Sequence, residues 1–89
     1  MIHSLAGGEL AKNKVADLAK VKIIDGIYAN KIFFYINELS KLKISDIVNV
    51  PVGTYNTKAR AEVLKIYYNV SYDLSPVPFN RLKKIISKI

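Results

Sequence analysis

Aromatic rings alternate with aliphatic side chains in the segment Ile32-Phe33-Phe34-Tyr35-Ile36. If this segment is a β-strand, Phe33 and Tyr35 lie on one face and Phe34 on the other, because successive side chains point to opposite faces. Rings on a strand are typical of sites for single-stranded nucleic acid, where each stacked base contributes about 1–3 kcal/mol. A strand that is apolar on both faces also suits burial on both faces. The residues therefore leave two interpretations open: the rings stack on a ligand, or they form the core of a small domain.

The charge of the chain indicates an anionic partner. The 89 residues include 14 Lys and Arg against 7 Asp and Glu, a net charge of +7. Twelve of the basic residues are lysine, and an A/T-rich coding sequence or selection for solubility explains such a composition equally well. If nucleic acid is the partner, unspecific attraction for phosphates is expected from Lys31, Lys41, Lys43, Lys58 and Arg60. Two interpretations are open for four further rings, which either stack on bases or cap the core: Tyr55 in a loop and the cluster Tyr67, Tyr68 and Tyr72.

No group of residues has the composition of a catalytic or metal site. His3 is the only imidazole and lies in the loose N-terminal segment, away from the acids and nucleophiles of the predicted strands, so a Ser-His arrangement is not expected. The carboxylates are scattered, cysteine is absent, and there is no Gly-x-x-x-x-Gly-Lys-Ser/Thr loop. We therefore predict a protein that is not an enzyme and uses no metal or cofactor. The lack of cysteine fits a reducing cytoplasm, and the lack of an apolar run of about 18 residues argues against membrane contact.

The periodicity of apolar residues predicts a mainly β chain with one short helix. Ala11, Val15 and Leu18 lie at i, i+4 and i+7, which predicts a helix over 9–19. Alternation of apolar and polar residues predicts strands over 20–23, 32–37, 47–52 and 60–68. The alternation of the last strand slips at Val63-Leu64, which predicts a β-bulge. Such a bend would let a small antiparallel sheet close into a barrel.

The C-terminal segment 79–89 is ambiguous. Leu82, Ile85, Ile86 and Ile89 form a helical stripe, whereas Ile85-Ile86 between lysines also suits a short strand. We expect residues 1–19 to be a flexible N-terminus with a short helix. Residues 20–89 are then a single small β-barrel domain, with a helical turn allowed near the C-terminus.

Several short motifs occur in a recognisable order. They are Val21-Lys-Ile-Ile-Asp25, then Asn30-Lys-Ile-Phe-Phe-Tyr35-Ile-Asn-Glu38, and then Leu42-Lys-Ile-Ser-Asp-Ile-Val-Asn-Val-Pro-Val-Gly53. This order resembles the N-terminal domain of the primosomal replication-restart helicase, which binds the 3′ end of DNA. That family has a first strand ending in Asp, a Phe-Asp-Tyr strand and a segment ending in Val-x-Val-Pro-Phe-Gly. The resemblance continues through Ala61-Glu62-Val63 and Leu82-Lys83-Lys84-Ile85-Ile86 and covers about residues 19–89.

The resemblance implies an antiparallel β-barrel, a strand from Lys83 onward and a pocket for the terminal nucleotide. In the family, the positions of Phe33 and Tyr35 line this pocket together with the Pro-Phe-Gly turn. Lys83 would reach the terminal phosphate or sugar as a point charge, although a solvent-facing lysine is the simpler interpretation. The six candidate nucleic-acid-binding residues are Phe33, Phe34, Tyr35, Val52, Gly53 and Lys83.

The chain departs from the family pattern at four positions. Phe34 replaces the Asp of Phe-Asp-Tyr, so a carboxylate that helps to read the terminal nucleotide is missing. Val52 replaces the Phe of Pro-Phe-Gly, and Ala61 replaces a Gly. Ser45 replaces the Gly before Asp46, so we expect this turn to form without a positive φ. The helicase motor is also absent, so the resemblance is to the end-binding module standing alone.

The sequence thus predicts a non-enzymatic, monomeric, cytoplasmic module that binds single-stranded DNA with a preference for a 3′ end. Its partners would be DNA and a replication or helicase protein, in a role related to replication restart. The alternative is a protein-interaction or structural module that keeps the barrel without the DNA pocket. The replacement of Asp by Phe34 is the main reason for this alternative.

Overall fold

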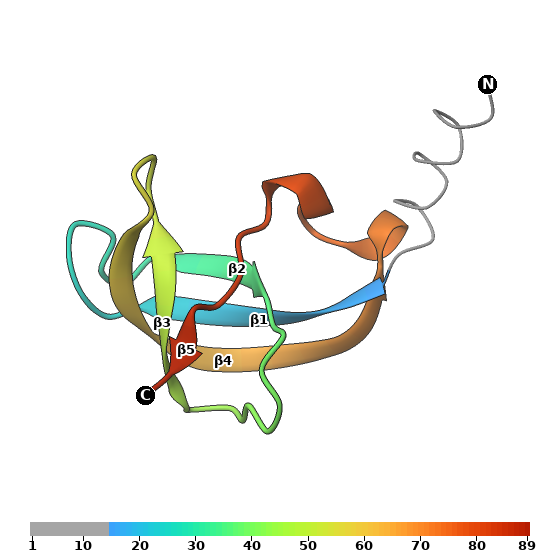
Figure 1. Cartoon of the computed structure of the whole chain (residues 1–89), viewed down its shortest axis with the longest axis horizontal. Coiled ribbons are helices and arrows are strands. Elements are labelled where there is room, and N and C mark those ends of the chain that lie inside the picture. Colours follow the sequence, from blue (N-terminus) through green and yellow to red (C-terminus); the bar gives the residue numbers. More distant parts are fainter. Residues whose placement is uncertain (1–14) are drawn as a thin grey trace.

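The computed structural model describes residues 15–89, which form a single five-stranded antiparallel sheet (Figure 1). The strands are β1 (Val15–Ile23), β2 (Ile32–Ile36), β3 (Ile47–Val52), β4 (Thr57–Ser71) and β5 (Ser87–Lys88). Their order in the sheet is β2-β1-β4-β3-β5. Two 3₁₀ turns, η1 (Tyr72–Leu74) and η2 (Phe79–Arg81), lie between β4 and β5. The prediction of a mainly β fold is confirmed.

Strand β4 pairs with both halves of the sheet. Its first part pairs with β3 over 57–62, and its longer remainder pairs with β1 over 61–71. The strand curves strongly between these two parts (Figure 1). The register steps from Lys20↔Lys65 to Val21↔Val63, so Leu64 is an additional residue in β4. The bulge predicted at Val63-Leu64 is therefore confirmed.

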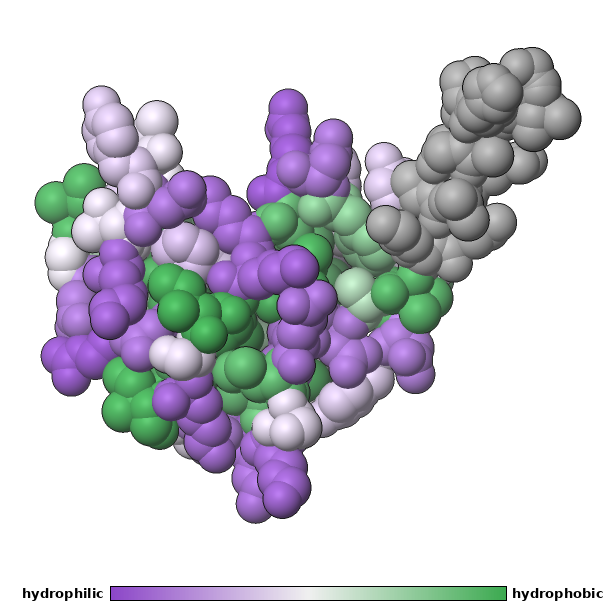
Figure 2. All heavy atoms as spheres, in the orientation of Figure 1, coloured by the Kyte–Doolittle hydropathy of each residue, from purple (hydrophilic) through white to green (hydrophobic). Residues whose placement is uncertain are grey.

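The inner face of the curved sheet carries the hydrophobic core. Strands β1, β3 and β4 each contribute completely buried side chains to this core. They include Val21 and Ile23 from β1, Val48 and Val50 from β3, and Val63 from β4. Hydrophilic side chains surround the apolar patches on the face of the molecule that Figure 2 shows. Burial of β-branched residues at every second position accounts for the alternation seen in the sequence.

The C-terminal segment crosses the inner face from β2 to β3 (Figure 1). The N–H of Ile36 donates to the carbonyl of Lys83 at 2.8 Å, and the N–H of Ile85 donates to the carbonyl of Ile36 at 3.1 Å. Further along, the N–H of Ile86 donates to the carbonyl of Asn49 at 2.8 Å. Ile85 is buried in the core, so the tail closes the core on the side that the sheet leaves open.

The helix predicted over 9–19 is wrong in the part that the structure describes, because residues 15–19 belong to β1. Residues 9–14 lie outside the described residues. A stripe of three apolar residues is a weak helix signal, and a helix of this length needs tertiary contacts. Pairing with β2 and β4 satisfies the backbone of this segment instead. The domain boundary predicted between residues 19 and 20 consequently falls inside β1.

The predicted barrel is also wrong, because the sheet is open. Within the described residues, a single isolated parallel bridge, Ile36↔Lys84, links the β2 edge to the tail. The β4 bulge bends the sheet as expected, but β5 has only two residues and pairs only with β3. A closed barrel needs a continuous ladder between its first and last strands. The tail, for which helix and strand were both open, contains the 3₁₀ turn η2 and the two-residue strand β5.

The turn before β3 contradicts the expectation for Ser45, whose φ is +77. Two main-chain hydrogen bonds hold this turn. The N–H of Ser45 donates to the carbonyl of Val63 at 2.8 Å, and the N–H of Asp46 donates to the carbonyl of Lys43 at 3.1 Å. The Asp46 carboxylate also accepts the N–H of Lys43 at 2.8 Å, and this bond lowers the pKa of the carboxyl group. The surrounding hydrogen bonds therefore hold a serine in the left-handed region.

Candidate nucleic-acid interface

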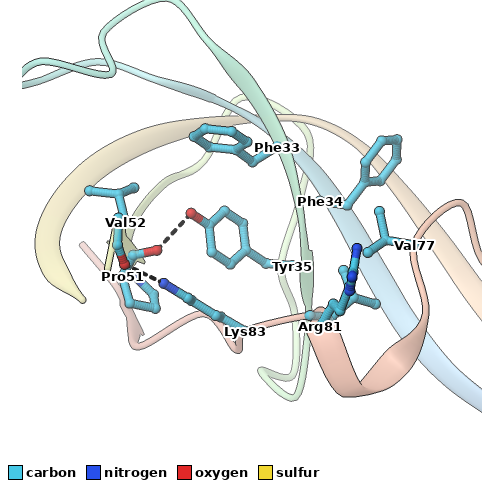
Figure 3. A pocket seen from close by; sticks show the side chains of 10 residues that line it. Phe33, Phe34, Tyr35, Pro51, Val52, Val77, Arg81 and Lys83 are labelled. Atoms are coloured by element: carbon cyan, nitrogen blue, oxygen red, sulfur yellow. Dashed lines mark hydrogen bonds between the residues drawn. The ribbon is translucent and has the colours of Figure 1, made fainter. Parts of the chain in front are cut away.

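A hollow of about 230 Å³ lies between β2, the end of β3 and the C-terminal segment (Figure 3). We call it the corner hollow. All six residues predicted from the sequence line it, together with four that were not predicted. The described lining residues are Phe33, Phe34, Tyr35, Pro51, Val52, Gly53, Val77, Arg81, Leu82 and Lys83. The sheet thus brings together side chains that lie up to 50 positions apart in the chain.

Tyr35 forms the floor of the corner hollow and is not a free stacking platform. Its side chain is buried, with 4% of the residue surface exposed, and its hydroxyl donates to the carbonyl of Pro51 at 2.8 Å. Burial raises the pKa of the Tyr35 phenol to about 12. The Pro51 carbonyl is free to accept the Tyr35 hydroxyl because alternate carbonyls of β3 point away from β4. On that side β3 pairs with β5 only at Val48 and Asn49. At Pro51 this side of β3 is an open edge, where a residue without an N–H is tolerated.

Gly53 directly follows β3, has a φ of +73 and lies against the ring of Tyr28. A Cβ atom at this position would be 3.1 Å from the Tyr28 hydroxyl and 3.3 Å from Cε2, so the space suits glycine. The Gly53 carbonyl accepts a hydrogen bond from Lys83 Nζ at 2.7 Å. An ammonium group has three N–H donors, so Lys83 retains two for an oxygen of a ligand. The corner therefore positions the ammonium at the hollow.

The three consecutive aromatic residues of β2 have different surroundings. Phe33 is half-buried and meets the edge of Tyr28, with ring centroids 6.0 Å apart. Phe34 points away from Phe33 and Tyr35 (Figure 3), and its ring lies 6.2 Å from that of Tyr67 on the other face of the sheet. Of the predicted rings, Phe33 consequently offers the corner hollow a partly accessible aromatic surface, and Phe34 contributes only to its rim.

Arg81 is the most informative lining residue that sequence reasoning missed. It ends the 3₁₀ turn η2, which follows Pro78, and its side chain is exposed beside Lys83. A guanidinium group binds phosphate with two parallel hydrogen bonds, whereas an ammonium group acts as a point charge. Its position two residues before Lys83 in the sequence could have indicated that Arg81 lies near the same site. In the part of the chain that is described, the lining of the corner hollow contains two cations and no carboxylate.

The other cations predicted to attract phosphate do not line the corner hollow. Arg60 is held by Asp25 through two hydrogen bonds of 2.8 and 3.1 Å, and this contact lowers the pKa of the Asp25 carboxyl group. The other four are exposed: Lys31, Lys41, Lys43 and Lys58. Tyr55 is 92% exposed in the turn after Gly53, whereas Tyr72 packs against Phe79 with ring centroids 5.4 Å apart.

Comparison of the chain with protein-family models, with curated proteins and with solved structures found no match. Over residues 15–89, no three His, Cys, Asp or Glu side chains are grouped in a way that would hold a metal ion. In the same range, no helix is long and apolar enough to cross a membrane. The interpretation of the corner hollow therefore depends on its own geometry and charge.

Proposed function

We propose that this chain is a non-enzymatic module that binds single-stranded DNA and holds its 3′-terminal nucleotide in the corner hollow. One observation carries the proposal: an apolar and partly aromatic wall faces two cations, with no carboxylate in the described lining. A nucleotide has the matching parts, a base with an apolar face and an anionic phosphate. The net charge of +7 would draw such a ligand toward the protein.

The contacts in the corner hollow support a division of roles. The Lys83 ammonium, positioned by the Gly53 carbonyl, donates to an oxygen of the terminal phosphate or sugar. Arg81 provides a planar donor pair for the neighbouring phosphate. The base packs against the half-buried Phe33, while the buried Val52 and Tyr35 support the wall from below. The order of motifs resembles the N-terminal domain of the replication-restart helicase. This resemblance implies an end pocket at Phe33, Tyr35 and the corner, and it supports a role beside a replication or helicase protein.

The proposal is tested by comparing a linear oligonucleotide with the same sequence closed into a circle. We expect the amide NMR signals of Phe33, Gly53 and Lys83 to shift more with the linear strand, since only that strand has free ends, and to shift less when its 3′-hydroxyl is replaced by a 3′-phosphate. Equal shifts with both strands would remove end recognition. No shift with either strand at low salt would remove DNA binding and favour the protein-interaction or structural module.

A matched pair of variants separates a specific contact from general charge. Lys83→Ala removes a charge-assisted contact of about 1.5–3 kcal/mol, so we expect binding of the linear strand to weaken by at least about tenfold. Lys84→Ala removes the same charge one position away, where the side chain is exposed and pairs with Glu38 at 3.3 Å. Equal losses in the two variants would contradict the assigned role of Lys83. A thermal unfolding curve for each variant shows that the fold is retained.

A further inference from the structure

The outer face of β1 carries two lysines in the second half of its pairing with β4, which runs from Val15 to Ile23. Ala19, Val21 and Ile23 are completely buried on the inner face. The intervening residues, Lys20 and Lys22, consequently point to the outer face, because side chains alternate along a strand. Neither lysine belongs to the lining described for the corner hollow.

Strand β4 continues this basic surface. Ala59, Ala61 and Val63 are buried inward, so residues 58, 60 and 62 point outward before the bulge at Leu64. Beyond the bulge, residue 65 is the direct partner of Lys20 and returns to the outer face. We call the resulting set the outer basic strip; it consists of Lys20, Lys22, Lys58, Arg60 and Lys65. Glu62, opposite Lys22, is the carboxylate among these outward positions.

Most of the outer basic strip lacks a neutralising partner inside the described chain. Of its five cations, Arg60 forms an ion pair, with Asp25. Lys20 and Lys65 stand directly opposite each other, an arrangement of like charges that destabilises a sheet. Lys65 Nζ lies 5.1 Å from the centre of the Tyr67 ring, which holds this ammonium on the outer face. An uncompensated pair of this kind is stabilised when an external anion binds between the two charges.

The neighbouring rings indicate that the external anion is a phosphate backbone. Phe34, the β2 partner of Lys20, and Tyr67 are half-buried and pack against each other, so they offer little surface on which an unpaired base can stack. Contacts from lysines to phosphates carry no sequence information and depend on charge density. A duplex carries one negative charge per about 1.7 Å of its axis, and its counterion release per contact exceeds that of a single strand.

We infer that the outer basic strip is a second nucleic-acid contact surface, which binds the phosphate backbone of duplex DNA independently of sequence. The strip adjoins the β2 edge, since Phe34 lies at the rim of the corner hollow and is also the partner of Lys20. A duplex on the outer face and a strand end in the corner hollow would thus contact opposite faces of β2. The inference does not require the corner hollow to bind DNA.

The experiment uses a DNA dumbbell, a duplex closed by a loop at both ends, because it has no 3′ end for the corner hollow. Binding is followed by fluorescence anisotropy over a series of salt concentrations. We expect Lys20→Gln with Lys65→Gln to weaken dumbbell binding at low salt and to reduce the slope of log K against log salt by about 2, one for each lysine that no longer meets a phosphate. The control replaces Lys43 and Lys84, two exposed lysines outside the strip, with glutamine.

Three outcomes would overturn the inference. The dumbbell does not bind at low salt, the two double variants lose the same affinity, or the Lys20 and Lys65 variant weakens a single strand but not the dumbbell. Lys83→Ala is expected to leave dumbbell binding unchanged, so failure of the corner hollow and failure of the strip are distinguishable. The double substitution removes two like charges that stand opposite each other, so the thermal midpoint of the Lys20 and Lys65 variant should not fall. An unchanged midpoint shows that weaker binding by this variant does not come from misfolding.

Discussion

Gly26 and Gly53, the two glycines among residues 15–89, both have a left-handed backbone and provide a controlled test of the corner, because only Gly53 is crowded. Gly26 has a φ of +78 and no heavy atom within 4 Å of the position that a Cβ atom would take, whereas Gly53 has a φ of +73 and the Tyr28 ring at 3.1–3.5 Å. Substitution by alanine forces an L-residue into the left-handed region at both sites, which costs about 1–2 kcal/mol. At Gly53 the added Cβ must also displace Tyr28, and an off-rotamer side chain costs about 0.5–1.5 kcal/mol more.

We therefore expect Gly26→Ala to lose about 1–2 kcal/mol of stability and Gly53→Ala to lose about 1.5–3.5 kcal/mol. For a domain of this size, 1 kcal/mol corresponds to a shift of about 4–8 °C in the thermal midpoint, so the two variants are separable by circular dichroism. Only Gly53→Ala should also weaken binding of a linear DNA strand, because Lys83 Nζ is positioned by the Gly53 carbonyl. Equal losses of stability in Gly26→Ala and Gly53→Ala would show that the Tyr28 side chain moves away from the added Cβ atom without a cost. An unchanged Gly26→Ala variant would refute the argument from backbone strain.

Two further predictions concern Tyr35 and Ser45. The pKa of Tyr35 is raised from about 10 in the unfolded chain to about 12, so its contribution to stability is complete below pH 10 and is lost as the pH rises toward 12. In urea unfolding curves measured over a pH series, Tyr35→Phe should lose less free energy of unfolding between pH 10 and pH 12 than the unchanged protein. The same pH dependence in both proteins would contradict the raised pKa of Tyr35. Ser45→Gly should raise the free energy of unfolding by about 1 kcal/mol, since glycine adopts φ +77 without the Cβ penalty. A lower thermal midpoint for this variant would show that Ser45 contributes a contact that outweighs its strain.

The central strands were predictable from sequence because burial on one face imposes a period of two. The prediction for β3 over 47–52 agrees with Ile47–Val52, and the slipped alternation located the bulge at Leu64. The start of β1 was not predictable in this way. Val15 is exposed and Leu18 and Ala19 are both buried, so the alternation is lost near the irregular pairing with β4. Local periodicity there resembled a helix, and only pairing with distant strands decides the structure.

The composition of the corner hollow was partly predictable for a similar reason. Phe33, Tyr35, Val52 and Gly53 are fixed by strand alternation and by the end of β3, which are local features. Arg81 depends on the path of the C-terminal segment, which is set by single hydrogen bonds to β2 and β3 rather than by a repeating pattern. The open sheet has the same origin, because no local pattern shows that the tail will meet β2 through one bridge instead of a continuous ladder.

The position of Phe34 bears on what the corner hollow can recognise. Its side chain packs with Tyr67 on the outer face, so its ring does not occupy the space between Phe33, the corner and Lys83. A phenyl ring provides no hydrogen-bond acceptor at the rim, and the Gly53 carbonyl already accepts a hydrogen bond from Lys83. If the corner hollow binds a strand end as proposed, recognition must depend on cationic donors and shape rather than on acceptance of a hydroxyl proton. Because contacts from lysine and arginine to phosphate release counterions, the proposed end binding should then weaken steeply as salt increases.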